Sequence, residues 1–150
     1  MAESTPFQEI LEDLLVSTGA SRTTLRLDLP NHDAGLDEVV AEALAPGVRS
    51  TRGNTSIRNL RDSPPIRFLE EQRTPLVQED CSRADPAPPP ELIELYGVRA
   101  QMLAPIVREG RLAGVISVHY VPGPRQWSAE DIAALREAAE RVQRELDAAV

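Results

Sequence analysis

The chain has 150 residues, of which 41% are hydrophobic and 27% charged, and its formal net charge is −8. This length suffices for one domain with a full hydrophobic core. The acidic balance argues against binding to nucleic acid, because such binding depends on basic residues that neutralise phosphates. There is no run long enough for a membrane-spanning helix and no signal-peptide pattern, so we expect a cytoplasmic protein without membrane or nucleic-acid partners.

Residue usage also limits the chemistry of the chain. Cys81 is the single cysteine, which excludes an intramolecular disulfide and a thiolate metal cluster. The neighbouring carboxylates of Glu79 and Asp80 are expected to raise the pKa of this thiol, which favours an inert cysteine over a redox centre. All 16 basic residues are arginines, as GC-rich bacterial codon usage would produce.

The first third of the chain predicts one helix and one or two strands. Thr5 and Gln8 form a capping box around Pro6, and Gly19 fits the end of the helix that follows. Residues 23–29 alternate between leucines and polar residues, which predicts a half-buried strand. Residues 36–44 suit either a strand or a short helix.

The middle of the chain is less regular. Residues 46–63 are polar and predict a loop, and a helix is expected from Ser63 to a point before Pro75. A short strand is expected over residues 75–78. The proline-rich residues 84–90 then form a connector that leads into a short helix over 91–96.

The last third predicts a hairpin and a long helix. Two apolar strands meet at a tight Glu109–Gly110 turn, and Ser128 to Asp131 form a second capping box before a helix that reaches nearly to Val150. The whole order of elements predicts an α+β fold, in which helices cover one face of a sheet and loops the other.

Polar side chains on one face of this hairpin mark the candidate site. Ser117 and His119 share one face of the otherwise apolar second strand, and such a face usually borders a pocket or a hydrogen-bond network. On the first strand, Arg99 and Gln101 share a face by alternation. We therefore expect a partly apolar cavity that at least Gln101 and His119 reach.

Four motifs of this region resemble the GAF domain, and most closely the chromophore-binding GAF domains of phytochromes. They are Gly97-Val98-Arg99-Ala100, the strand from Gly110 to His119, Pro124-Arg125, and Trp127-Ser128 with Asp131-Ile132. The resemblance implies that residues 1–150 are a single GAF domain. It implies a GAF/PAS-like central antiparallel sheet with the terminal helices on one face. A ligand pocket with loops and short helices would cover the other.

The resemblance further implies a sensory or regulatory domain that binds a small molecule and is not an enzyme. The ligand would lie between the sheet and residues 46–96, and the resemblance does not identify it. Phytochromes attach a bilin through a cysteine where this chain has Pro88-Pro89-Pro90, which argues against a covalent bilin. No metal ligands and no catalytic residues are predicted. The candidate ligand-binding residues are Tyr96, Asp80, Arg99, Gln101, Ser117 and His119.

Two other functions stay open, namely a dimerising protein-interaction module with a degenerate pocket and a redox-active protein that uses Cys81. Apolar residues of the last helix recur every three or four positions, at Ile132, Leu135, Ala139, Val142 and Leu146. This stripe predicts a homodimer through helices 5–16 and 129–149, next to the alternative that the stripe packs on its own sheet. A signalling partner protein would then recognise the dimer.

Overall fold

The structure is a computed structural model and describes residues 5–28, 35–52 and 59–148. Within these residues, five strands form one antiparallel sheet in the order β2-β1-β5-β4-β3. The strands are β1 (Arg22–Leu27), β2 (Val39–Leu44), β3 (Leu76–Gln78), β4 (Ala100–Arg108) and β5 (Arg111–Tyr120). The β4–β5 hairpin turns at Glu109 and Gly110, which both have positive φ, as the sequence predicts.

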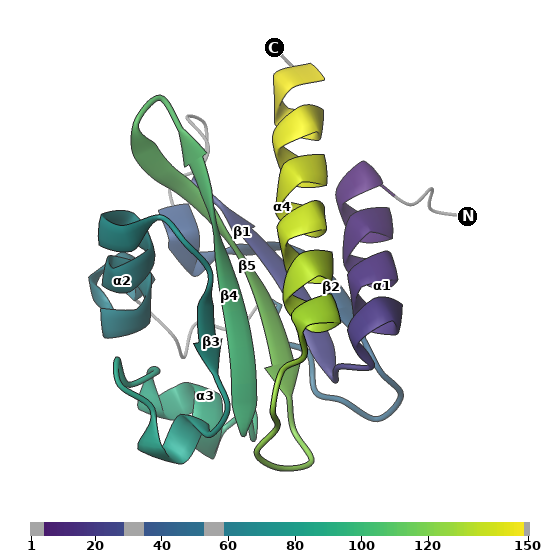
Figure 1. Cartoon of the computed structure of the whole chain (residues 1–150), viewed down its shortest axis with the longest axis vertical. Coiled ribbons are helices and arrows are strands. Elements are labelled where there is room, and N and C mark those ends of the chain that lie inside the picture. The colour runs from purple at the N-terminus through teal and green to yellow at the C-terminus, as the bar shows by residue number, and fades with distance from the viewer. Residues whose placement is uncertain (1–4, 29–34, 53–58, 149–150) are drawn as a thin grey trace.

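Helices cover both faces of the sheet. Helices α1 (Pro6–Thr18) and α4 (Ala129–Ala148) lie side by side on one face. The shorter α2 (Pro64–Gln72) and α3 (Pro90–Glu94) lie on the other (Figure 1), with the 3-10 turns η1 (Gly35–Asp37), η2 (Leu60–Asp62) and η3 (Cys81–Arg83). The predicted α+β layering is confirmed. None of the described helices combines the length and apolar character needed to cross a bilayer.

The ends of the two long helices follow their sequence signals closely. In α4, Ser128 and Asp131 form a complete capping box, since each side chain accepts a hydrogen bond from the other residue's backbone N–H at 3.0 Å. In α1, Thr5 Oγ1 accepts from Gln8 N at 3.1 Å. The Gln8 side chain, however, donates to the Glu42 carbonyl of β2 instead of returning to Thr5, so this box is half formed.

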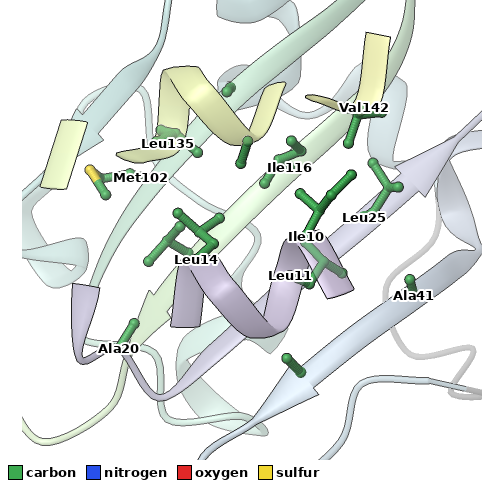
Figure 2. Close-up of a cluster of buried hydrophobic side chains, with 14 of the residues drawn as sticks. Ile10, Leu11, Leu14, Ala20, Leu25, Ala41, Met102, Ile116, Leu135 and Val142 are labelled. Atoms are coloured by element: carbon green, nitrogen blue, oxygen red, sulfur yellow. The ribbon is translucent and has the colours of Figure 1, made fainter. Parts of the chain in front are cut away.

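The apolar stripes of α1 and α4 pack against the sheet of their own chain. Figure 2 shows Leu11 and Leu14 of α1 and Leu135 and Val142 of α4 around Ile116 of β5. Leu135 and Val142 are both 0% exposed. The intramolecular alternative for the stripe is therefore correct for these residues. A homodimer through the helices stays a prediction, and these two side chains are not available to it.

Strand β1 differs from its prediction in burial. The pattern indicates one solvent face, yet all six residues are buried, including Arg22, Thr24 and Arg26. The expectation is wrong because η1 packs against β1 and the 45–52 loop is bonded to Arg22 on that face, so both sides of the strand are covered. The ambiguous segment 36–44 contains the turn η1 and the edge strand β2. Leu29 lies outside the described residues.

Candidate ligand-binding site

A cavity of about 30 Å³ lies between the sheet and the layer of η2, α2 and α3. About 10–15 Å³ is enough for one water molecule, so this space holds water or a group of a few heavy atoms. Its roof comes from described residues that precede β4 in the chain, among them Ile66, Pro89 and Leu92. Its floor on the sheet is formed by Arg26, Gln101, Leu103, Val115, Ser117 and His119. The position between sheet and residues 46–96 is the one the sequence predicts.

His119 of β5 contributes a neutral imidazole to this floor. Its Nδ1 lies 2.9 Å from Arg22 Nη1, and because a guanidinium can only donate, Nδ1 is the acceptor. The ring proton is therefore on Nε2. Burial lowers the pKa of His119 well below its usual value, and the charges of Arg22 and Arg26 lower it further. The ring thus stays neutral at physiological pH.

Arg22, which holds this imidazole, is fully buried and ties the sheet to the following loop. Its Nε and Nη2 donate to the Arg49 carbonyl at 3.1 and 2.6 Å, and Nε lies 4.0 Å from Glu42 Oε2. The Glu42 carboxylate also accepts from the Thr51 backbone and hydroxyl. This network fixes the 45–52 loop, whose Thr51 lines the cavity.

Gln101 of β4 lies directly opposite His119 in the strand register and is 1% exposed. Its Nε2 donates to Gln78 Oε1 at 2.7 Å, and Gln78 Nε2 donates to the Pro86 carbonyl at 2.6 Å. Gln101 Oε1 has no hydrogen-bond partner within the described part of the chain. Buried acceptors are rarely left unpaired, and Oε1 is therefore a polar atom whose hydrogen bonding the described part of the chain leaves incomplete.

Three of the six predicted site residues meet at the cavity, namely Gln101, Ser117 and His119. Tyr96 does not line it. The Tyr96 ring is buried beneath two guanidinium groups, with Arg22 Cζ at 5.5 Å and Arg49 Cζ at 5.3 Å from its centroid. Tyr96 therefore supports the network behind the cavity.

Arg99 and Asp80 also lie outside the cavity. Arg99 precedes β4, so the alternation that aligns it with Gln101 does not carry its exposed side chain to the cavity. Asp80 caps η3 and accepts from the Ser82 hydroxyl and backbone, and these bonds lower the pKa of its carboxyl. It borders an open groove beside β3 with Arg83.

Sequence reasoning missed Arg26, and although it placed the roof within residues 46–96 it named none of the residues that form it. The signal for Arg26 was present, because Arg22, Thr24 and Arg26 alternate on one strand face, but that face was interpreted as facing solvent. In the structure Arg26 is 8% exposed and its Nη1 donates to the Leu36 and Asp37 carbonyls at 3.1 and 2.8 Å. The roof residues carry no periodic pattern that could have placed them.

Cys81 does not line the cavity. It is 3% exposed, and burial, reinforced by Asp80, raises the pKa of its thiol to about 12. Among the described residues, no group of three or more His, Cys, Asp and Glu side chains is placed to hold a metal ion. The cavity itself is lined by apolar side chains together with the polar side chains of Gln101, Ser117 and His119.

An antiparallel sheet with terminal helices on one face and a partly apolar cavity on the other places the chain among the α+β domains that carry a cavity on one sheet face. A family model of the GAF domain matches residues 4–146. The chain therefore belongs to the GAF family. No curated protein matches it in sequence.

Several solved structures of similar fold are GAF domains or chromophore-binding domains of photoreceptors. The cyanobacteriochrome TePixJ GAF domain superposes with a TM-score of 0.77 at 20% identity, over 98% of this chain and 96% of that one. The blue-light-absorbing form of the Thermosynechococcus elongatus PixJ GAF domain gives 0.72 at 21% identity, over 94% and 84%. The chromophore-binding domain of bacteriophytochrome RpBphP3 from R. palustris gives 0.71 at 20%, over 99% and 56%. At these identities the similarity is one of fold.

Proposed function

We propose that this GAF domain is a regulatory sensor that binds a small molecule in the cavity and does not turn it over. The observation that carries the proposal is Gln101 Oε1, a buried acceptor without a partner within the described residues, at the floor of a cavity opposite His119. Family membership and the fold shared with chromophore-binding GAF domains support the same function.

Three features favour binding over catalysis. His119 is neutral and bonded to Arg22, an arrangement that offers no proton relay. Burial keeps Cys81 protonated, and its side chain does not line the cavity. Pro88-Pro89-Pro90 occupies the stretch where the resemblance to phytochromes would place an attachment cysteine, so we propose that the ligand is held without a covalent bond.

Native mass spectrometry of freshly purified protein tests the function. We expect a bound mass that is retained under gentle conditions, lost on denaturation, and reduced in a Gln101→Met variant. Gln126→Met is the matched control, because Gln126 is exposed and remote from the cavity. A wild-type protein that carries no bound mass and shows no change in thermal stability with any of a panel of metabolites would contradict the proposal.

We also propose a cytoplasmic homodimer that passes ligand occupancy to a partner protein. The helices α1 and α4 pack on the back of the sheet whose other face forms the cavity floor. A ligand-dependent shift of the sheet would therefore reach the outer surface of these helices. The acidic composition supports the absence of nucleic-acid binding.

A further inference from the structure

Two groups outside the cavity decide which atoms its polar side chains present. The first is the Pro86 carbonyl, which can only accept hydrogen bonds. Gln78 must therefore turn its amide nitrogen toward Pro86, and it does so at 2.6 Å. Gln78 Oε1 then faces Gln101 Nε2 at 2.7 Å. A reversed Gln101 amide would set two oxygens against each other, so Gln101 has to present Oε1 away from Gln78.

The second group is Arg22, which can only donate. Its Nη1 donates to His119 Nδ1 at 2.9 Å, so the neutral ring carries its proton on Nε2. Within the described residues, this contact is the single hydrogen bond of the His119 ring. Neither Arg22 nor Gln78 lines the cavity. Both residues therefore influence which polar atoms face the cavity without forming part of its wall.

The acceptor and the donor belong to neighbouring strands. Gln101 and His119 are paired in the register of β4 and β5, and both side chains lie on the cavity floor. Directly opposed residues have Cβ atoms about 4.5–5.5 Å apart, so one small planar group can reach both. The apolar side chains of Leu103 and Val115 border the same floor.

We infer that the cavity recognises a neutral amide edge, whose N–H donates to Gln101 Oε1 and whose C=O accepts from His119 Nε2–H. The inference rests on the proposed function, since it names the ligand class of the same cavity. A carboxylate lacks the donor and would set its oxygen against Gln101 Oε1, and a ketone leaves Oε1 unpaired. Gln78 and Arg22 are positioning residues that set this preference without touching the ligand.

The wild-type protein provides the first test. We expect ¹⁵N chemical shifts of His119 to report the Nε2–H tautomer at pH 7. Acetamide, acetone and acetate are nearly isosteric and serve as probes, titrated while the His119 ring and Gln101 side-chain signals are followed. Acetamide is expected to bind about tenfold more tightly than acetone, because leaving a buried acceptor unpaired typically weakens binding by roughly fivefold to a hundredfold. Acetate is expected to bind no better than acetone.

Variants separate the contact residue from the positioning residue. Gln101→Met is expected to abolish the preference for acetamide over acetone, and Gln126→Met to leave it unchanged. Gln78→Met frees the Gln101 amide to reverse and should reduce the preference several-fold. Gln78→Glu still offers an acceptor to Gln101 Nε2, so it should preserve the preference even where it lowers stability.

The outcomes distinguish this inference from the proposed function. An Nδ1–H tautomer, or acetone or acetate binding as tightly as acetamide, overturns the inference, while a bound mass in native mass spectrometry would leave the sensor function intact. If no probe perturbs Gln101 or His119, the amide class is wrong. If, in addition, native mass spectrometry finds no bound mass, the proposed sensor function is contradicted as well.

Discussion

At the scale of the residue, the fully buried Arg22 connects three polar groups from separate parts of the chain. Its guanidinium contacts the Arg49 carbonyl, His119 Nδ1 and, at 4.0 Å, the Glu42 carboxylate. Removing one member of a buried charged network leaves the others without compensation, which costs about 3–5 kcal/mol. We expect Arg22→Met to lower the free energy of unfolding by about that amount in urea titrations. The exposed Arg67 of α2 provides the control, and an Arg22→Met effect as small as that of Arg67→Met would contradict the network.

His119 gives the molecule a specific pH response. Its pKa in the folded state lies well below 6.5, chiefly because of burial, so the unfolded chain binds more protons over the interval between the two values. Stability that this group contributes is therefore complete above the unfolded pKa and is lost as pH falls below it, with a slope of at most about 1.4 kcal/mol per pH unit. We expect the His119 ring signals not to titrate between pH 7 and 6 in the folded protein. Titration near pH 6.5 would show that the ring is solvated.

The thiol of Cys81 should be unreactive in the folded protein. With a pKa of about 12 and 3% exposure, the thiol holds almost no thiolate at pH 8. We expect the native protein to react with a thiol-specific disulfide reagent far more slowly than the urea-unfolded protein. Cys81→Ser should keep the fold and the probe affinities. Rapid labelling of the native protein, or loss of an activity in Cys81→Ser, would contradict this prediction and favour the redox function.

At the scale of the element, Gly114 of β5 leaves no room for a side chain against β1. A Cβ on Gly114 would lie 2.7 Å from the Arg26 carbonyl oxygen and 2.7 Å from Leu27 Cδ2. The strands would have to separate next to the cavity, and such overpacking costs about 1–3 kcal/mol. We expect Gly114→Ala to lower the thermal midpoint clearly. Gly123→Ala meets no atom within 4 Å and should be nearly neutral, so equal effects of the two changes would refute the close approach.

Elements with local signals could be predicted from the sequence. The caps of α1 and α4, the hairpin turn and the short strand β3 depend on neighbouring residues, and the structure places them where the patterns indicate. The burial of β1 depends on η1 and on the 45–52 loop, which follow the strand in the chain and fold back over it, whereas its alternating polar residues suggested a solvent-exposed face. Local periodicity carries no information about such a covering layer.

At the scale of the whole molecule, the sequence predicts part of the candidate site, and the rest depends on contacts between distant parts of the chain. Gln101 and His119 stand out because each is polar on an apolar strand. The partners that orient them, Gln78 with Pro86 and Arg22 with Arg49, come from separate parts of the chain. Their hydrogen bonds arise only when the loop layer closes on the sheet. The sequence therefore indicates where the cavity lies, and the folded structure is needed to assign donor and acceptor within it.

Association of the whole molecule through its terminal helices would have to use their outward face. Leu135 is 0% exposed against its own sheet, so Leu135→Glu is expected to destabilise the monomer and cannot report on dimerisation.

Val16 of α1 is 82% exposed and offers the better probe of dimerisation. We expect the wild type to sediment as a dimer at high concentration, and Val16→Glu to shift it toward monomer, because a charge without a partner in an apolar contact must lose its hydration. Arg136→Glu, at an exposed site of α4, tests whether the contact reaches that helix. A wild-type protein that stays monomeric at every concentration would mean that both helices pack only on the sheet of their own chain. A different protein would then have to recognise whether the cavity holds a ligand.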